Sequence, residues 1–394
     1  MKKALVLGGG FAGVEAAIYL RKDNYDVTLV TNRNYFYIYP TSIWVPTNEC
    51  SFEDVCVDMD ELSKAHKFSL IIDDVVDISA KDSKVSLANG QVLSDYDHLI
   101  VAMGASKMKH KGLENTLSIC GAPEQSLEIK YQFDKLISLG KGKVCFGFGG
   151  NPNDSSAVRG GPGFELLFNL HNLLVKKGIR DNFELTFFAP MEEPGKRMGP
   201  QALKMMDMMF SKLGIKQHFG KKISEFQEDG IVFEDASKLD SDFTMFIPAG
   251  DGNEVIKNSD LPTNPAGFIK TDNFSNVVFD DPSMPTNIYA VGDIASLEGY
   301  DWRAKQGHIA EVMARNVAHN ISQKDQGLND FKGYHEHLNI LCVMDTGDGA
   351  AFVYRDQKRA FMLPMPIFGH WLKKGWGSYC RNSKLGKIPR IPGM

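Results

Sequence analysis

The N-terminal end of the chain carries the most restrictive pattern in the sequence. An apolar run over residues 4–7 predicts a short buried strand, and Gly8, Gly10 and Gly13 follow it in the spacing G-x-G-x-x-G. A helical run over residues 14–20 comes next. In such a strand–turn–helix unit the first glycine allows a tight turn, the second lets a pyrophosphate approach the backbone, and the third lets helix and strand pack closely. Because the helix N-terminus adds free N–H groups and a positive dipole end, we predict that a dinucleotide binds here.

Composition excludes several classes of protein. The chain has 394 residues, 43% of them hydrophobic, and can bury a large core divided between two or three domains. Its net charge of −5 gives no indication of a nucleic-acid partner. No apolar run approaches the roughly 18–20 residues of a membrane-spanning helix, and the N-terminus has the pattern of a strand rather than of a signal peptide. Six cysteines in a chain this long do not indicate a disulfide scaffold, so we expect redox use of one or two, or burial as small apolar residues.

The end of the second predicted strand bears on which dinucleotide binds. This strand covers residues 26–30 and is followed by Thr31 and Asn32. An NAD-binding fold normally has an acidic residue here, which holds the ribose hydroxyls. The missing carboxylate argues against a simple NAD site, although hydroxyl and amide groups can still bond a ribose. An aromatic-rich segment over residues 34–44 follows, and it either packs in the core or forms a wall beside a planar cofactor ring.

Two later segments point to FAD. Residues 96–104 follow the pattern Tyr-Asp-x-Leu-Ile-x-Ala-x-Gly, a marker of flavoproteins with two dinucleotide-binding domains. In residues 287–295 a strand delivers Gly292 and Asp293 to the ribityl chain, where the carboxylate accepts a hydroxyl hydrogen bond. Because the three motifs occur in this order, we predict FAD as the cofactor, and we expect no metal site. The residues expected to contact FAD are Gly8, Gly10, Phe11, Ala12, Gly13, Thr31, Asn32, Pro40, Val75, Ala102, Gly104, Gly292 and Asp293.

A second glycine-rich segment, residues 144–152, lies between these motifs. In a pyridine-nucleotide reductase it would form the NAD(P)H turn and lead directly into a helix. Here residues 153–159 interrupt the pattern, and the next strand, residues 183–188, ends without a ribose-binding acid. We therefore predict an α/β fold with two Rossmann-like domains, of which the second has lost its NAD-binding chemistry.

Over its full length the chain resembles the sulfide:quinone oxidoreductases, which are flavoproteins related to flavocytochrome c sulfide dehydrogenase and to type II NADH dehydrogenases. The motifs that carry the resemblance are the aromatic loop 34–45, the cysteine segments 117–120 and 339–342, the Asp/Gly-rich turn 345–352, and the segments 161–165 and 304–308. The resemblance implies an enzyme that oxidises sulfide to sulfur or polysulfide through cysteine and FAD and then reduces a membrane quinone.

The resemblance also implies roles for four residues. Cys342 and Cys120 match cysteine sites of the family, and we expect a nearby cation, Lys305 or Arg159, to favour the Cys342 thiolate. Lys305 would contact FAD and stabilise negative charge on reduced flavin or quinone; the alternative is a solvated surface lysine. Glu165 would relay protons; the alternative is a plain carboxylate at a helix start.

One position departs from the family pattern. The family normally has a cysteine about six residues before Glu165, and this chain has Arg159 there. The cysteine that pairs with Cys342 therefore stays open, with Cys145 or the Cys50 and Cys56 pair as candidates. For Cys145, inside an apolar strand, a structural role is the alternative.

The C-terminal region bears on the electron acceptor. Residues 361–379 mix aromatics, methionines and paired lysines, and the tail 381–390 is basic without an acid. Five large side chains recur near helical spacing: Phe368, Trp371, Leu372, Trp376 and Tyr379. This pattern predicts an interfacial helix in one leaflet, with Lys373 and Lys374 at the lipid headgroups and Phe368, Trp371 and Tyr379 at the quinone; the alternative is an ordinary core helix.

These observations together predict a peripheral protein of a prokaryotic cytoplasmic membrane. We expect an FAD-binding domain over residues 1–110 and 261–325, a second Rossmann-like domain over residues 111–260, and a quinone- and membrane-associating region over residues 326–394. The rival functions are an NAD(P)H:quinone oxidoreductase and a redox-inactive FAD-binding module. The oligomeric state stays open, a homo-oligomer included.

Overall fold

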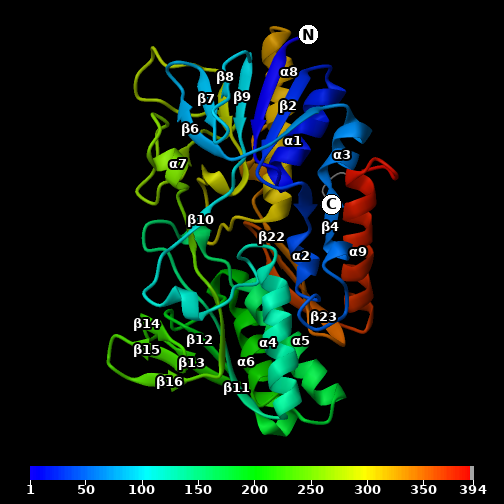
Figure 1. The fold of residues 1–394 in the computed structure, drawn as a ribbon, viewed down its shortest axis with the longest axis vertical. Coiled ribbons are helices and arrows are strands. Elements are labelled where there is room, and N and C mark those ends of the chain that lie inside the picture. Colours follow the sequence, from blue (N-terminus) through cyan, green and yellow to red (C-terminus); the bar gives the residue numbers. More distant parts are fainter. Residues whose placement is uncertain (391–394) are drawn as a thin grey trace.

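The computed structural model describes residues 1–390 and shows an elongated molecule of two stacked α/β layers, with the C-terminal helix beside both (Figure 1). The N-terminal layer is built on a parallel sheet in the order β20-β9-β1-β2-β5. Its strands are β1 (Lys3–Leu7), β2 (Asp26–Thr31), β5 (Ser69–Ile72), β9 (His98–Val101) and β20 (Ile288–Ala290). The chain thus returns to the first sheet after the second layer is complete.

Helices and a small antiparallel sheet complete the N-terminal layer. Helices α1 (Phe11–Lys22) and α8 (Gly307–Asp325) pack against each other and bury the apolar side chains of β1 and β9. Parallel strands buried in this way read as continuous apolar runs rather than as alternating ones. The remaining elements of the layer are β3 (Tyr35–Tyr37), α2 (Tyr39–Ser42), β4 (Cys56–Asp58), α3 (Met59–His66), β6 (Val75–Ser79), β7 (Lys84–Leu87), β8 (Val92–Leu93), α7 (Glu254–Lys257), β19 (Ile269–Lys270) and β21 (Ala295–Ser296).

The second layer contains a parallel sheet in the order β13-β12-β11-β17. Its strands are β11 (Gly142–Phe148), β12 (Phe183–Ala189), β13 (Lys216–Phe219) and β17 (Phe243–Ile247). Phenylalanine-rich packing against α4 (Gln125–Leu139), α5 (Gly161–Lys176) and α6 (Pro200–Lys212) covers one face. The antiparallel sheet β14 (Ile223–Gln227), β15 (Gly230–Phe233) and β16 (Lys238–Asp240) covers the other. The short pair β10 (Ser106–Lys107) and β18 (Gly250–Asp251) lies where the layers meet.

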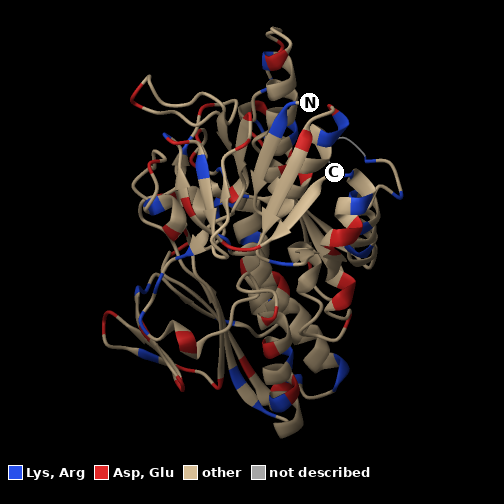
Figure 2. Ribbon diagram, turned by 45° about the horizontal axis from the view of Figure 1, so that its top comes forward, with Lys and Arg blue, Asp and Glu red and all other residues tan. Residues whose placement is uncertain are grey.

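The C-terminal region forms a three-stranded antiparallel sheet and a long helix. These are β22 (Ile340–Asp345), β23 (Gly349–Arg355), β24 (Ala360–Pro366) and α9 (Phe368–Lys384). Lys384 anchors the end of α9 to the N-terminal layer through Glu15 at 2.5 Å and Glu311 at 2.6 Å. Lysines, arginines and acidic residues are interspersed over both layers (Figure 2). Within residues 1–390, no helix combines the length and the apolar character needed to cross a membrane.

Candidate active site

The first glycine turn has the geometry that dinucleotide binding requires. Gly8 has φ +113°, and a Cβ there would lie 2.3 Å from the Ala102 carbonyl oxygen. A Cβ on Gly13 would lie 1.8 Å from the Gly8 carbonyl oxygen, whereas a Cβ on Gly10 would meet nothing within 4 Å. No side chain caps the N-terminus of α1, and its first turn has no acid. The free N–H groups thus face open space beside Gly10, which fits a pyrophosphate.

The other residues expected to bind FAD differ in burial, and Thr31 lies against the turn. Thr31 is buried beneath Gly9, its hydroxyl 2.4 Å from where a Cβ on that glycine would stand, whereas Asn32 is exposed. Pro40 lies in the first turn of α2. Val75 begins β6 and packs against the core of the N-terminal layer. The roles of these residues in binding FAD stay predictions.

The second FAD marker brings charged groups together. Gly292 has φ +76°, and Asp293 follows it and forms an ion pair with Arg159. Burial opposes ionisation of Asp293, but Arg159, Lys305 and Lys107 together hold its pKa below the ordinary value. A partly buried carboxylate kept ionised beside the α1 turn can accept hydrogen bonds from hydroxyl groups, as a ribityl chain requires.

Lys305 is buried, which excludes the alternative of a solvated surface lysine. It is 7% exposed, its ammonium donates to the Ala295 carbonyl, and its Nζ lies 3.9 Å from the centre of the Phe268 ring. Burial lowers the pKa of Lys305 to about 8, with Asp293 opposing the shift. A lysine with a pKa near neutrality can carry or release a proton under working conditions.

Cys342 lies on β22 beside a buried ion pair that joins α5 to α9. Its Sγ is 3.8 Å from Glu165 Oε1, and Glu165 pairs with Lys373. Glu165 and Lys373 are 4% and 5% exposed. Burial raises the pKa of Glu165, and Lys373 opposes that shift. The carboxylate is therefore a partnered group inside the fold and not a plain helix-start residue.

Two expectations about charges near Cys342 are wrong. Burial raises the pKa of the Cys342 thiol to about 12, and the charge of Glu165 adds to the shift. The cation that opposes it is Lys373, and neither Lys305 nor Arg159 contributes. Lys373 also does not face lipid headgroups, because the buried Glu165 carboxylate holds it inside the protein.

A second polar network next to Cys342 was missed from the sequence. The buried Asp345 accepts from His370 at 2.6 Å, from Asn169 at 3.0 Å and from the Trp44 indole at 3.3 Å. The other ring nitrogen of His370 lies 3.3 Å from Glu49, which is partly exposed. A histidine between a buried and a surface carboxylate has the geometry of a proton path. No sequence signal joins Trp44 to Asp345, which is 301 positions away.

All six cysteines are free thiols within residues 1–390, and Cys50, like Cys342, packs against the core that contains Cys120. Cys120 is buried in the core against which Cys342 packs, and burial raises its pKa while Arg159 and Lys107 oppose the shift. Cys145 packs in a different core, on the other face of β11, with its Sγ 3.8 Å from the Asp240 carbonyl. Cys145 is thus a structural thiol, and its candidacy as the partner of Cys342 is wrong.

Helix α9 has an unusual distribution of side chains. Its buried face includes His370, Lys373 and Cys380. Phe368 and Trp371 are each 65% exposed, next to exposed side chains of β24. The first turn of α9 therefore does not have the pattern of an ordinary core helix, whose apolar side chains face the interior. Tyr379 is half-buried two turns away, so the three residues expected at a quinone do not form one exposed cluster.

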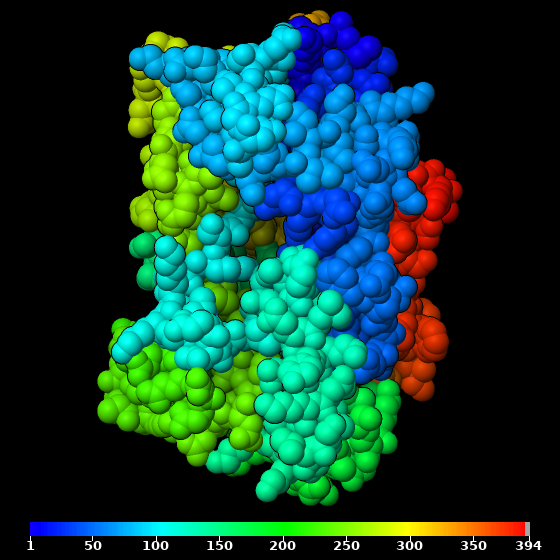
Figure 3. All heavy atoms as spheres, viewed as in Figure 1, coloured from blue at the N-terminus to red at the C-terminus, as the bar shows by residue number. Residues whose placement is uncertain are grey.

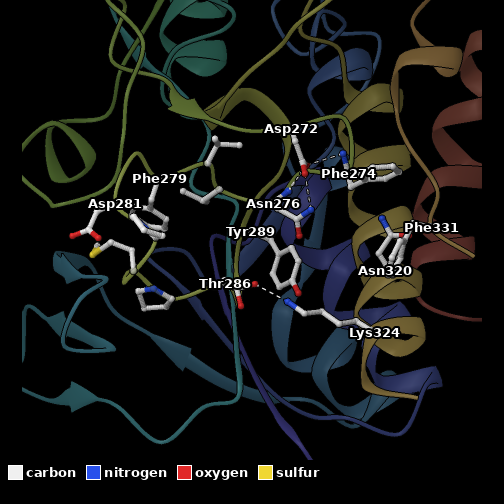
Figure 4. Close-up of a pocket in the computed structure, with 15 residues that line it drawn as sticks. Asp272, Phe274, Asn276, Phe279, Asp281, Thr286, Tyr289, Asn320, Lys324 and Phe331 are labelled. Atoms are coloured by element: carbon white, nitrogen blue, oxygen red, sulfur yellow. Dashed lines mark hydrogen bonds between the residues drawn. The ribbon is translucent and has the colours of Figure 1, made fainter. Parts of the chain in front are cut away.

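A separate cavity of about 560 Å³ lies at the N-terminal layer, between the loop 272–286 and α8 (Figure 4). Tyr289 and Phe331 line it, and Lys324 donates to the Thr286 carbonyl at 2.9 Å across one side. None of the residues expected to bind FAD, sulfur or quinone lines this cavity.

A model of the family described as "Pyridine nucleotide-disulphide oxidoreductase" matches residues 2–318. The chain belongs to this family. Its N-terminal strand–turn–helix unit is intact, and the family binds FAD, so the prediction of FAD as the cofactor is confirmed. The protein is thus an FAD-dependent oxidoreductase of mixed α/β fold.

Individual relatives confirm the predicted resemblance of the chain to the sulfide:quinone oxidoreductases. The chain is 26% identical to the sulfide-quinone reductase of Aquifex aeolicus, over 96% of this chain and 90% of the relative. It is 22% identical to the type II NADH:quinone oxidoreductase of Staphylococcus aureus, over 92% and 93%. The X-ray structure of the sulfide:quinone oxidoreductase from Aquifex aeolicus superposes with a TM-score of 0.85 at 24% identity, over 98% of this chain and 93% of that one.

The second nucleotide turn of this pyridine nucleotide-disulphide oxidoreductase differs from the first. β11 ends at Phe148, and α5 begins only at Gly161. The Phe148 ring packs on Gly160, where a Cβ would lie 2.6 Å from the ring. The Phe148 ring therefore occupies the space beside Gly160, whereas Gly161, the first residue of α5, has open space like Gly10.

Proposed function

We propose that the protein oxidises sulfide to sulfur or polysulfide and passes the electrons to a membrane quinone. The observation that carries this proposal is the position of Cys342 beside the buried pair of Glu165 and Lys373. Two relatives of this chain are both named for quinone as substrate, and one of them is named for sulfide. Both match over most of this chain.

The chemistry assigns distinct tasks to the two sides of the site. Hydrosulfide releases two electrons and one proton when it becomes zero-valent sulfur, and a quinone takes up two electrons and two protons. Bound FAD would supply a carrier that accepts two electrons from a sulfur donor and gives them to the quinone. The protein must provide a nucleophilic sulfur on one side and protons on the other.

Cys342 is the proposed sulfur nucleophile, and Glu165 its proton partner. The thiol must lose its proton before its sulfur can act as a nucleophile. Glu165 Oε1, at 3.8 Å, is in position to receive that proton once Glu165 is ionised. Lys373 keeps that carboxylate in place. The path through Asp345, His370 and Glu49 would exchange protons with solvent.

The first turn of α9 is the proposed contact with the membrane. Phe368 and Trp371 extend into solvent, and Leu363 and Ile367 of the neighbouring strand end are 51% and 71% exposed. Apolar and aromatic side chains of this kind insert into the interfacial region of a bilayer. Docking there would bring the protein to a lipid-soluble quinone, and we propose a peripheral position on the prokaryotic cytoplasmic membrane.

Anaerobic titration of the FAD-loaded protein tests this function against its rivals. Sulfide should bleach the flavin absorbance, and a quinone should restore it. Bleaching by NADH alone would instead indicate a type II NADH:quinone oxidoreductase, the activity for which the relative from Staphylococcus aureus is named. Bleaching by neither donor would indicate a redox-inactive FAD-binding module. The interrupted second turn, in which β11 ends at Phe148 and α5 begins only at Gly161, favours sulfide over NADH.

A further inference from the structure

The last turn of α9 contacts two buried acids of the N-terminal layer. Glu15 of α1 is fully buried, and Glu311 of α8 is 6% exposed. The buried Lys384 ammonium of α9 bridges them, at 2.5 Å from Glu15 and 2.6 Å from Glu311. Arg315 and Arg390 contact the same two acids at distances of 2.6–3.5 Å. Figure 3 shows α9, in red and orange, lying along blue segments of the N-terminal layer.

This bridge adjoins the FAD-binding turn. Glu15 comes two residues after Gly13, in the second turn of α1. The Lys384 Nζ lies 5.9 Å from the centre of the Phe11 ring, at the first residue of α1, and 5.7 Å from that of the Phe36 ring. The two rings pack edge to face with their centres 4.9 Å apart. Lys384 therefore contacts the helix whose N-terminal N–H groups the pyrophosphate of FAD would meet.

The bridge also bears on the spacing between the two FAD motifs. A Cβ on Gly292 would lie 3.0 Å from the Ala12 Cβ of α1 and 3.3 Å from the Ala310 Cβ of α8. The segment that carries Asp293 therefore packs against both helices. A shift of α1 against α8 would change the distance between the first glycine turn and Asp293, and both are expected to hold FAD.

Burial opposes the charge of Glu15 and of Lys384, and the neighbouring charges restore it. Burial acts to raise the pKa of Glu15, but Lys384, Arg390 and Arg315 together hold that pKa below its ordinary value. Burial acts to lower the pKa of Lys384, but Glu15 and Glu311 hold that pKa above its ordinary value. Both groups are therefore ionised at neutral pH. A buried ion pair often adds little net stability, because desolvation offsets the attraction.

We propose that Lys384 is a positioning residue for FAD, which holds the α1 turn and the Gly292–Asp293 segment at the spacing that the cofactor requires. Because its ammonium is buried between Glu15 and Glu311, it acts through these two acids. The family model ends at residue 318, so this contribution comes from a part of the chain outside the matched region. The inference concerns the cofactor alone and does not depend on the sulfide:quinone activity.

FAD release from the loaded, full-length protein tests this role without turnover. The loaded protein is diluted, and the fluorescence of free FAD at equilibrium gives the Kd. The variant is Lys384→Met, which leaves Glu15 paired with Arg315 and Arg390. The matched control is Arg381→Met, in the same turn of α9, because Arg381 donates to the backbone carbonyls of residues 53, 54 and 56, in the segment that leads into β4.

The expected result is an FAD Kd raised about tenfold in Lys384→Met, equal to about 1.4 kcal/mol, and unchanged in Arg381→Met. The visible circular dichroism of the bound flavin, recorded at saturating FAD, should also change in Lys384→Met, because the cofactor is held differently. A purely structural role would lower the unfolding free energy of Lys384→Met and leave both the Kd and the dichroism as in the wild type. That result overturns the proposal.

A second variant keeps the test decisive if Lys384→Met does not fold. Glu311→Gln keeps the pair of Lys384 with Glu15 and removes the charge on the α8 side of the bridge. Its FAD Kd should also rise, and a wild-type Kd in this variant would then overturn the proposal. Equal increases of the Kd in Lys384→Met and Arg381→Met would do the same, because any loosening of α9 would suffice to weaken FAD binding.

Discussion

Replacing Lys373 by methionine should damage both the stability and the chemistry of the protein. Lys373 and Glu165 are almost fully buried, so the substitution leaves a carboxylate without its counter-charge. Removing one partner of a buried ion pair costs about 3–5 kcal/mol, and uptake of a proton by Glu165 keeps the cost at the lower end. Lys373 also lowers the pKa of Cys342, so its loss should raise that pKa further and slow flavin reduction by sulfide.

The assay combines chemical unfolding with stopped-flow reduction of the flavin. Lys374→Met is the matched control for stability, because its side chain is 32% exposed and its partner Glu49, at 3.1 Å, is 21% exposed. A surface pair of this kind contributes at most about 1 kcal/mol. The double variant Glu165→Gln with Lys373→Met should regain stability over Lys373→Met, since it removes the buried charge as well. Equal unfolding free energies for Lys373→Met and Lys374→Met would refute the buried pair.

Three further outcomes are expected. Lys305 loses its charge as the pH rises through about 8. The flavin reduction potential should therefore fall more steeply with pH in the wild type than in Lys305→Met. A potentiometric titration that gives both proteins the same pH profile would exclude this role of Lys305. Trp371→Ser should weaken binding to anionic lipid vesicles, measured by flotation. The control Tyr131→Ser replaces a similarly exposed aromatic residue of α4 and should leave vesicle binding unchanged. Equal binding by both variants would count against the membrane contact. Gly13→Ala should lose FAD, measured by absorbance after gel filtration, because its Cβ would overlap the Gly8 carbonyl, whereas Gly161→Ala has open space and should retain it; full FAD content in Gly13→Ala would contradict the turn geometry.

The sequence was most informative where function depends on the local chain. Gly8, Gly10 and Gly13 have backbone requirements that only glycine meets, and their spacing alone predicts the strand–turn–helix unit that the structure contains. The same applies to Gly292, whose positive φ lies next to Asp293. FAD was therefore predictable from residues that lie within short segments.

The parts that could not be predicted depend on contacts between distant segments. Lys373 looks like a headgroup-binding lysine in a helix with exposed aromatics, and only Glu165, 208 positions away, explains why it is buried. Burial raises the pKa of the Cys342 thiol, and β22 places the thiol beside the Glu165 carboxylate, which adds to the shift. A local pattern contains no information about such pairings.

Cys145 is another residue whose role the sequence alone could not decide. Its position in an apolar strand left open which face of the sheet it occupies. Strand alternation places Val144 and Phe146 towards the core of α5, whereas Cys145 faces the β14–β16 sheet. The register of β11, which the fold determines, excludes Cys145 as the redox partner of Cys342.

We propose that electrons from sulfide reach a quinone through Cys342 and FAD. The most direct measurement is sulfide-dependent reduction of a soluble quinone analogue, followed anaerobically by absorbance, with Cys342→Ala compared with Cys145→Ala at equal FAD content. We predict that Cys342→Ala loses at least about 100-fold in rate, since the nucleophile is removed, and that Cys145→Ala retains near wild-type activity. Wild-type activity in Cys342→Ala, or equal losses in both variants, would exclude Cys342 as the sulfur nucleophile.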